Sequence, residues 1–147
     1  MLRLYLLLLP ALAFAGSLGV HAQVAGGTMA SIPAKSSIHL DLTSPDALQI
    51  SSGKTDLRID YHKINTLEYG QNVSRRYAAA ILVSPVLLLS KSRKHFVTLG
   101  FVDADGNQQA LVLRVEKGDI RSLLASLEAR SGRRIEYTDD EARKAGK

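Results

Sequence analysis

Apolar and polar side chains alternate along several short segments in the first half of the chain. Residues 38–42 place three apolar side chains on one face and polar ones on the other, and a period of two is typical of a strand with one buried face. The same alternation predicts strands over residues 47–50, 57–61 and 64–69. Ser, Gly, Asn or Asp, which favour turns, separate most of these segments.

Two further strands are predicted over residues 95–102 and 110–116, on either side of a short polar segment. Within that segment, residues 103–107, the Asp-Gly step supplies the positive φ angle that a tight turn needs. The segment differs from a calcium-binding EF-hand loop, because its glycine stands at position 4 and an arginine at position 12. We therefore predict a β-hairpin here.

One amphipathic helix is predicted after the hairpin. Its apolar residues recur at i, i+3, i+4 and i+7, as Ile120, Leu123, Leu124 and Leu127. Asp119 is the expected N-cap, and Gly132 is expected to end the helix in the left-handed conformation. A last short strand is expected over residues 135–137, and residues 139–147 resemble a charged, frayed tail. Such a helix must dock its apolar stripe on the sheet.

The N-terminus has the pattern of a secretory leader. Met1–Arg3 is short and positive, and residues 4–20 are mostly apolar. Val20-His21-Ala22 offers small or apolar residues for cleavage before Gln23. An uncleaved N-terminal anchor is the alternative, and on either interpretation the rest of the chain is exported.

Length and composition indicate one domain. The chain has 147 residues, with 46% hydrophobic and 22% charged, which argues against general disorder. It contains no cysteine, so disulfides, thiol catalysis and cysteine-ligated metal sites are excluded. The expected organisation is a signal peptide over 1–22, a flexible lead-in rich in Gly, Ala and Ser over 23–37, a domain over 38–138 and a tail over 139–147. The net charge of +5 is mild, and export makes nucleic acid an unexpected partner.

Strands, a hairpin and then one helix predict an α+β or mostly-β fold: an antiparallel sheet or partly open barrel with a C-terminal amphipathic helix. Residues 57–64, 67–70 and 94–99, with the hairpin that leads into the helix, resemble small exported bacterial proteins of unknown function with a pleckstrin-homology-like (GRAM-like) domain. The resemblance covers roughly residues 46–138. It implies a module that binds lipid headgroups, peptides or partner proteins. The long apolar run after Tyr77 departs from that pattern.

That apolar run, residues 78–89, is interrupted only by Ser84 and Pro85. As a helix, residues 77–90 would reach about 21 Å, which is too short to span a hydrocarbon core of about 30 Å. It is either a buried core segment or an interfacial wedge bent at Pro85. The basic flanks favour contact with anionic headgroups, although they also suit a solvated rim. The predicted membrane or partner contacts are Arg75, Arg76, Ile81, Leu82, Val83, Val86, Leu87, Leu88, Leu89, Lys91, Arg93 and Lys94.

The function predicted from the sequence is that of an exported, non-catalytic binding module at a membrane or cell envelope. Its expected partner is an anionic lipid surface or an envelope protein, with no cofactor and no metal, and the oligomeric state is left open. One alternative is a protein-interaction module or homo-oligomer that uses a strand edge. Another is a small hydrolase or metalloenzyme, which would require four side chains to converge, namely those of His39, Asp41, Asp60 and His62.

Overall fold

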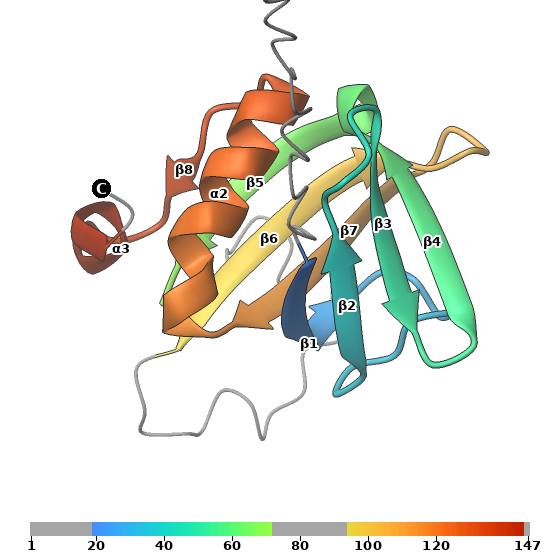
Figure 1. The fold of residues 1–147 in the computed structure, drawn as a ribbon, viewed down its shortest axis with the longest axis horizontal. Coiled ribbons are helices and arrows are strands. Elements are labelled where there is room, and N and C mark those ends of the chain that lie inside the picture. The colour runs from blue at the N-terminus through green and yellow to red at the C-terminus, as the bar shows by residue number, and fades with distance from the viewer. Residues whose placement is uncertain (1–18, 72–93, 146–147) are drawn as a thin grey trace, which may run out of the picture.

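The computed structural model describes residues 19–71 and 94–145. Within these ranges the chain is mostly β, with one eight-stranded mixed sheet and a long helix near the C-terminus (Figure 1). The strands are β1 (Gly19–Gly27), β2 (Ser37–Asp41), β3 (Ala47–Ser52), β4 (Thr55–Asp60), β5 (Ile64–Gly70), β6 (His95–Val102), β7 (Gln108–Val115) and β8 (Glu136–Tyr137). The mostly-β prediction with a C-terminal helix is confirmed.

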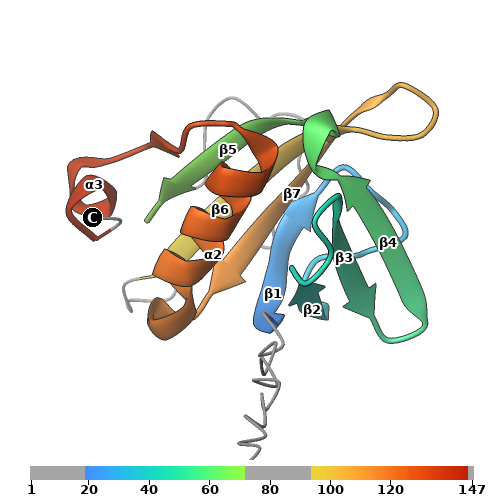
Figure 2. The same cartoon turned by 45° about the horizontal axis from the view of Figure 1, so that its top comes forward.

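The spatial order of the strands is β4-β3-β2-β1-β7-β6-β5-β8. Neighbouring strands are antiparallel except β5 and β8, which pair in parallel. A single 3-10 turn, η1 (Tyr61–Lys63), carries the chain from β4 at one edge to β5 next to the other. The sheet therefore bends round so that β1–β4 and β5–β7 form two walls joined where β1 meets β7 (Figure 2). The edges β4 and β8 do not pair, so the sheet is not closed.

Helix α2 (Lys117–Ser131) follows β7 and lies across β5 and β6 (Figures 1 and 2). Its four stripe residues are all buried and join the core, as predicted. Gly132 ends the helix with φ of 69°, and its amide donates to the Glu128 carbonyl. The N-cap is Glu116 and not Asp119, which lies inside the first turn. An acidic side chain in the first turn still interacts favourably with the positive end of the helix dipole.

Strand β1 is the largest difference between the structure and the prediction from the sequence. Residues 23–37 were predicted to be a flexible lead-in, but residues 23–27 belong to β1, which also includes residues 19–22 of the predicted leader. The strand is central, between β2 and β7. Small residues mislead here, because Gly and Ala are common in linkers but also allow close packing. At Gly27, a Cβ atom would lie 2.9 Å from a methyl carbon of Leu111. The leader itself, over residues 1–18, lies outside the described residues.

The C-terminal segment also differs from the prediction. Residues 139–147 were expected to be a frayed tail, but Asp140–Ala145 form the short helix α3. Ala142 in this helix is fully buried. The Asp139 carboxylate accepts the amide of Ala142 at 2.7 Å and that of Gln71 at 2.8 Å, so it ties α3 to the end of β5. A buried small residue and one capping carboxylate are weak signals in an otherwise charged sequence.

The hairpin between β6 and β7 is confirmed as a turn. Asp103 Oδ1 accepts the amides of Asp105 and Asn107, and Gly106 has φ of 83°. A side-chain hydrogen bond from Gln109 is the main cause that holds the Asp103 pKa below its ordinary value. The carboxylate is therefore occupied in organising the turn and is not part of a calcium loop. The other boundary change is small, since Tyr61 falls in η1 rather than in the preceding strand.

Candidate functional site

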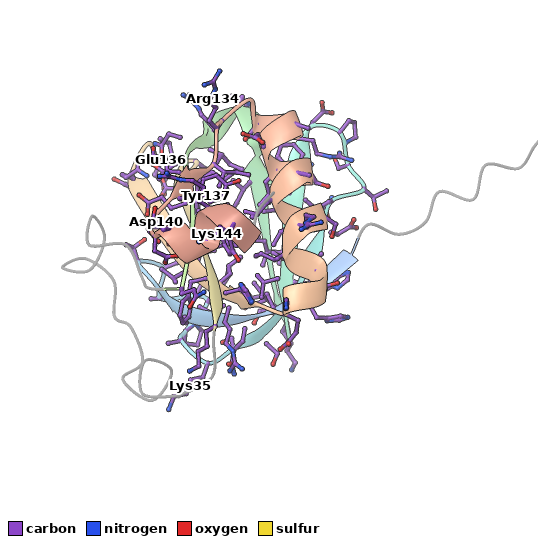
Figure 3. The ribbon with its side chains drawn as sticks, turned by 90° about the vertical axis from the view of Figure 1, so that its left-hand side faces the viewer. Lys35, Arg134, Glu136, Tyr137, Asp140 and Lys144 are labelled. Carbon is purple, nitrogen blue, oxygen red and sulfur yellow. The ribbon has the colours of Figure 1, made fainter. Side chains whose placement is uncertain are left out.

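An open hollow of about 870 Å³ lies at the end of the sheet where α2 begins. The start of β6, the end of β7, the first turn of α2 and one side chain of α3 form its walls. Its lining residues are Gln71, Lys94, His95, Arg114, Val115, Glu116, Lys117, Gly118, Ile120, Arg121 and Lys144. Figure 3 shows Lys144 on α3, on the side of the molecule where β8 and Tyr137 also lie. The consecutive elements β6, β7 and α2 therefore meet α3 and the end of β5 at one hollow.

The hollow is strongly basic. Among its described lining residues, five carry a Lys or Arg side chain and one carries a carboxylate, that of Glu116. Lys117, Arg121 and Lys144 are exposed, and Arg114 is partly exposed. The N-terminus of α2 adds further positive potential. Such a lining favours an anionic ligand.

The cations in this hollow are close enough to perturb one another. Burial and then the nearby Arg114 lower the pKa of Lys94, which is only 7% exposed. Burial and then Lys117 lower the pKa of His95, while Glu116 opposes that shift. Like charges within a few ångströms disfavour the protonated forms. An anion placed between these groups would relieve this repulsion.

His95 also contacts the core through Tyr69. The Tyr69 hydroxyl oxygen lies 2.6 Å from His95 Nδ1, and the two rings stack with centroids 5.9 Å apart. Burial is the main cause that raises the Tyr69 pKa, with contributions from Asp139 and Tyr137. Both shifts favour the neutral pair, in which the phenol can donate to the imidazole. The pair connects the hollow to β5.

The hollow lies where the apolar segment of the sequence leaves and rejoins the described chain. Gln71 and Lys94 are the described residues on either side of segment 72–93, and both line the hollow. Of the predicted membrane or partner contacts, Lys94 is at the site. The others lie outside the described residues, namely Arg75, Arg76, Ile81, Leu82, Val83, Val86, Leu87, Leu88, Leu89, Lys91 and Arg93.

Sequence reasoning missed four basic residues of the hollow. Arg114 lies on β7, Lys117 and Arg121 lie on α2, and Lys144 lies on α3. Lys144 was expected to lie in the charged tail over residues 139–147. The i, i+4 spacing of Lys117 and Arg121 was a local signal, because it places both side chains on one face of the predicted helix. Only the fold brings Arg114 and Lys144 to the same place.

The four residues of the hydrolase or metalloenzyme alternative are all described and do not converge. His39 and Asp41 lie on β2, and Asp60 ends β4, with β3 between the two strands. Neighbouring strands lie about 4.8 Å apart, so β2 and β4 are about twice that distance apart. Asp60 instead accepts a hydrogen bond from Arg58 at 3.2 Å, and Asp41 accepts the amide of Thr43 at 2.8 Å. No group of three or more potential metal ligands occurs within residues 19–71 and 94–145. The four side chains therefore do not form the cluster that this alternative required.

Comparison of the chain with family models and with curated proteins found no match. In the part of the chain that the structure describes, no helix is both long enough and apolar enough to cross a membrane. The site must therefore be interpreted from its own geometry and charge.

Proposed function

We propose that this protein is an exported, non-catalytic module of the pleckstrin-homology-like type that binds anionic lipid surfaces. The basic hollow at the start of α2 would hold headgroup phosphates, and the apolar run 78–89 would enter the interface beside it. This commits the sequence-based prediction to a lipid partner and adds Arg114, Lys117, Arg121 and Lys144 to its basic contacts.

The strand order is consistent with this type of fold. Seven of the eight strands lie in the order β4-β3-β2-β1-β7-β6-β5, and α2 follows β7 in the chain and packs against the bent sheet. This arrangement is consistent with a partly open barrel of that type. A fold alone does not specify a function. The charge and position of the hollow therefore carry the argument.

The position of the hollow is the single observation that supports the proposal best. Gln71 and Lys94, the described residues on either side of segment 72–93, both line a cavity with five basic side chains. The sequence of that segment carries the apolar run and four further Arg or Lys residues. Basic side chains near an anionic surface contribute about 1 kcal/mol each, and the contribution decreases as salt rises. Headgroup binding and apolar insertion would then occur at the same place.

Vesicle co-sedimentation tests the proposal, with a chain that begins at Gly16 to retain all described residues. We expect binding to vesicles of phosphatidylglycerol and phosphatidylcholine at low salt, and much weaker binding to pure phosphatidylcholine. The double variant Lys117→Glu/Arg121→Glu should weaken anionic binding at least about tenfold, since two favourable charges become unfavourable.

The matched control is Lys54→Glu/Arg134→Glu, which makes the same change in net charge at exposed positions outside the hollow. Figure 3 shows Arg134 well apart from Lys144. The control should keep most of the binding. Equal losses in both variants would mean that only net charge matters, and absence of binding to anionic vesicles would reject the lipid partner.

The open edge of β4 favours a protein-interaction module as the second candidate. β4 ends the strand order within the described chain, and an edge strand offers unpaired backbone groups to a partner. Sedimentation analysis of the chain from Gly16 separates the two candidates. A dimer that a proline at Arg58 abolishes would favour edge pairing, whereas a monomer that binds anionic vesicles would favour the lipid surface.

A further inference from the structure

We propose that His21 on β1 and His39 on β2 form a binding site for a divalent transition-metal ion, with Cu²⁺ as the preferred ion. Each imidazole would supply one nitrogen ligand, and water would fill the remaining coordination positions. The site lies on the outer face of the sheet and is separate from the basic hollow. It does not depend on lipid binding.

The pairing of β1 with β2 places the two histidines directly opposite each other. The antiparallel register joins His21 to His39, and residues paired in this way project from the same face with Cβ atoms about 4.5–5.5 Å apart. The residues on either side of each histidine along its strand are buried in the core. Both imidazoles therefore lie on the outer face. Because His21 was counted in the predicted leader, only the strand pairing brings the two together.

The separation of the two rings suits a shared metal ion. Their centroids are 4.8 Å apart and their planes are inclined by 49°. Two nitrogens bound to one tetrahedral Zn²⁺ at about 2.1 Å would be about 3.4 Å apart, and rings at the observed separation can each place one nitrogen at that distance. The His21 side chain is exposed, so its rotation can adjust the geometry.

One ring nitrogen of the pair lacks a hydrogen-bond partner. His39 Nδ1 is buried, and no group of residues 19–71 and 94–145 donates to it or accepts from it. A buried polar atom without a partner is unfavourable. Coordination of a metal ion between the rings would give this nitrogen a partner.

The charged groups around the pair favour a cation. Asp41 lies two residues after His39 and on the same face of β2. Hydrogen bonds from Thr43 are the main cause that lowers the pKa of Asp41, and the nearby His39 adds to the shift. On the other side, Glu116 and Arg114 line an open groove of about 310 Å³ together with His21. Two carboxylates thus stand against one guanidinium.

The number and type of ligands determine which ions the pair can hold. Within residues 19–71 and 94–145 no group of three or more potential metal ligands exists, so two imidazoles and water make an exchangeable site and not a permanent one. Imidazole nitrogens suit Cu²⁺, Ni²⁺ and Zn²⁺, and Cu²⁺ binds most tightly to a given set of such ligands. Mg²⁺ and Ca²⁺ prefer oxygen ligands. We therefore expect Cu²⁺ to bind more tightly than Zn²⁺, and Mg²⁺ not to bind at the same concentration.

Isothermal titration calorimetry with Cu²⁺, Zn²⁺ and Mg²⁺ tests the proposal on the full chain, purified with an affinity tag that contains no histidine. Intact mass confirms that His21 is present. The variants His21→Gln and His39→Gln should each weaken Cu²⁺ binding at least about tenfold, because one of two protein ligands is lost. The matched control is His62→Gln, which removes an exposed histidine on η1 and should keep the wild-type affinity.

The location of the ion is checked by NMR, since paramagnetic Cu²⁺ broadens the signals of nearby nuclei. Substoichiometric Cu²⁺ should broaden the amide signals of residues 20–22 and 38–40 before those of η1. Equal Cu²⁺ affinity in wild type and His21→Gln would overturn the proposal. An equally large loss of affinity in His62→Gln, or first broadening at η1, would also overturn it.

Thermal unfolding provides a second readout, because an ion held by both strands binds the folded chain better than the unfolded one. Zn²⁺ should raise the thermal midpoint of the wild type and of His62→Gln, but not that of His21→Gln or His39→Gln. Without metal, His21→Gln should unfold like the wild type, since the side chain is exposed. An equal rise in all four proteins would place the ion elsewhere and reject the site. Vesicle binding is measured without added metal, so neither result decides the other.

Discussion

Single residues in this protein show how position changes the role of a side chain. His39, His62 and His95 are each followed or preceded by a carboxylate or basic residue within a few positions. Only His95 is both buried and linked to another buried ring, through the 2.6 Å contact with Tyr69. The apolar segment beside the Asp-Gly turn placed its strand correctly, but its partners come from β5 and α2. The role of a titratable side chain therefore depends on its three-dimensional neighbours.

The lowered pKa of His95 predicts loss of stability in mild acid. Because burial and Lys117 favour the neutral form in the folded state, the unfolded chain takes up the proton first as pH falls below about 6.5. The stabilising contribution is therefore full above that value and is lost as pH falls toward the lower, folded-state pKa. Thermal midpoints measured from pH 7 to pH 5 should decrease for the wild-type chain.

Two variants isolate this effect. His95→Gln removes the titrating ring and should flatten the decrease, while His62→Gln changes an exposed histidine on η1 and should keep the wild-type slope. If both variants retain the same slope, acid destabilisation arises elsewhere. The groups that face His95 are Tyr69, Glu116 and Lys117, and all three remain in place in both variants.

At the scale of elements, β8 and α3 near the C-terminus are held to the sheet more closely than their charged composition suggests. β8 pairs with β5, and the Thr138 amide donates to the Tyr69 carbonyl at 3.0 Å. α3 is tied to the same strand end through Asp139. These contacts are possible because Gly70 has no side chain to occupy the space that Thr138 and Asp139 fill. The sequence shows that glycine only as a turn signal, because that space is filled by residues 68 positions or more away.

The substitution Gly70→Ala should detach or displace β8 and α3. A Cβ atom at Gly70 would overlap the Thr138 hydroxyl oxygen and lie 3.0 Å from an Asp139 carboxylate oxygen. Overpacking of this kind typically costs about 1–3 kcal/mol. Urea unfolding should show that decrease in the free energy of unfolding. In the control Gly118→Ala, at the start of α2, the added Cβ meets nothing within 4 Å, so stability should stay equal or rise slightly.

In the whole molecule, the strands in the middle of the sheet are well buried, whereas the edge strands are more exposed. β1 and β7 lie in the middle of the strand order, and residues 110–113 of β7 are fully buried. β4 stands at one edge, with an alternating exposed pattern, and carries no further strand in the described chain. The two walls share one core that α2 covers (Figure 2). Local stability should therefore decrease from the centre outward.

Native-state hydrogen exchange should reveal that gradient. We expect the amides of residues 111–113 to exchange most slowly, at rates set by global unfolding, and outward-facing amides of β4 to exchange orders of magnitude faster. NMR exchange measurements on the chain from Gly16 provide the test. If β4 is protected as strongly as β7, its edge is covered in solution, and the edge-pairing alternative gains support.

The sequence by itself determined the elements whose signal is local. The short apolar segments of β2–β7, the Asp-Gly turn, the apolar stripe of α2 and its glycine C-cap are patterns or turn chemistry within a few residues, and all of these elements are present. Only the tertiary structure decided that Gly19–Gly27 is a central strand, that α3 docks on β5, and that four separate elements build one basic hollow. The physical reason is that small residues and isolated charges acquire a role only from the neighbours that folding brings to them.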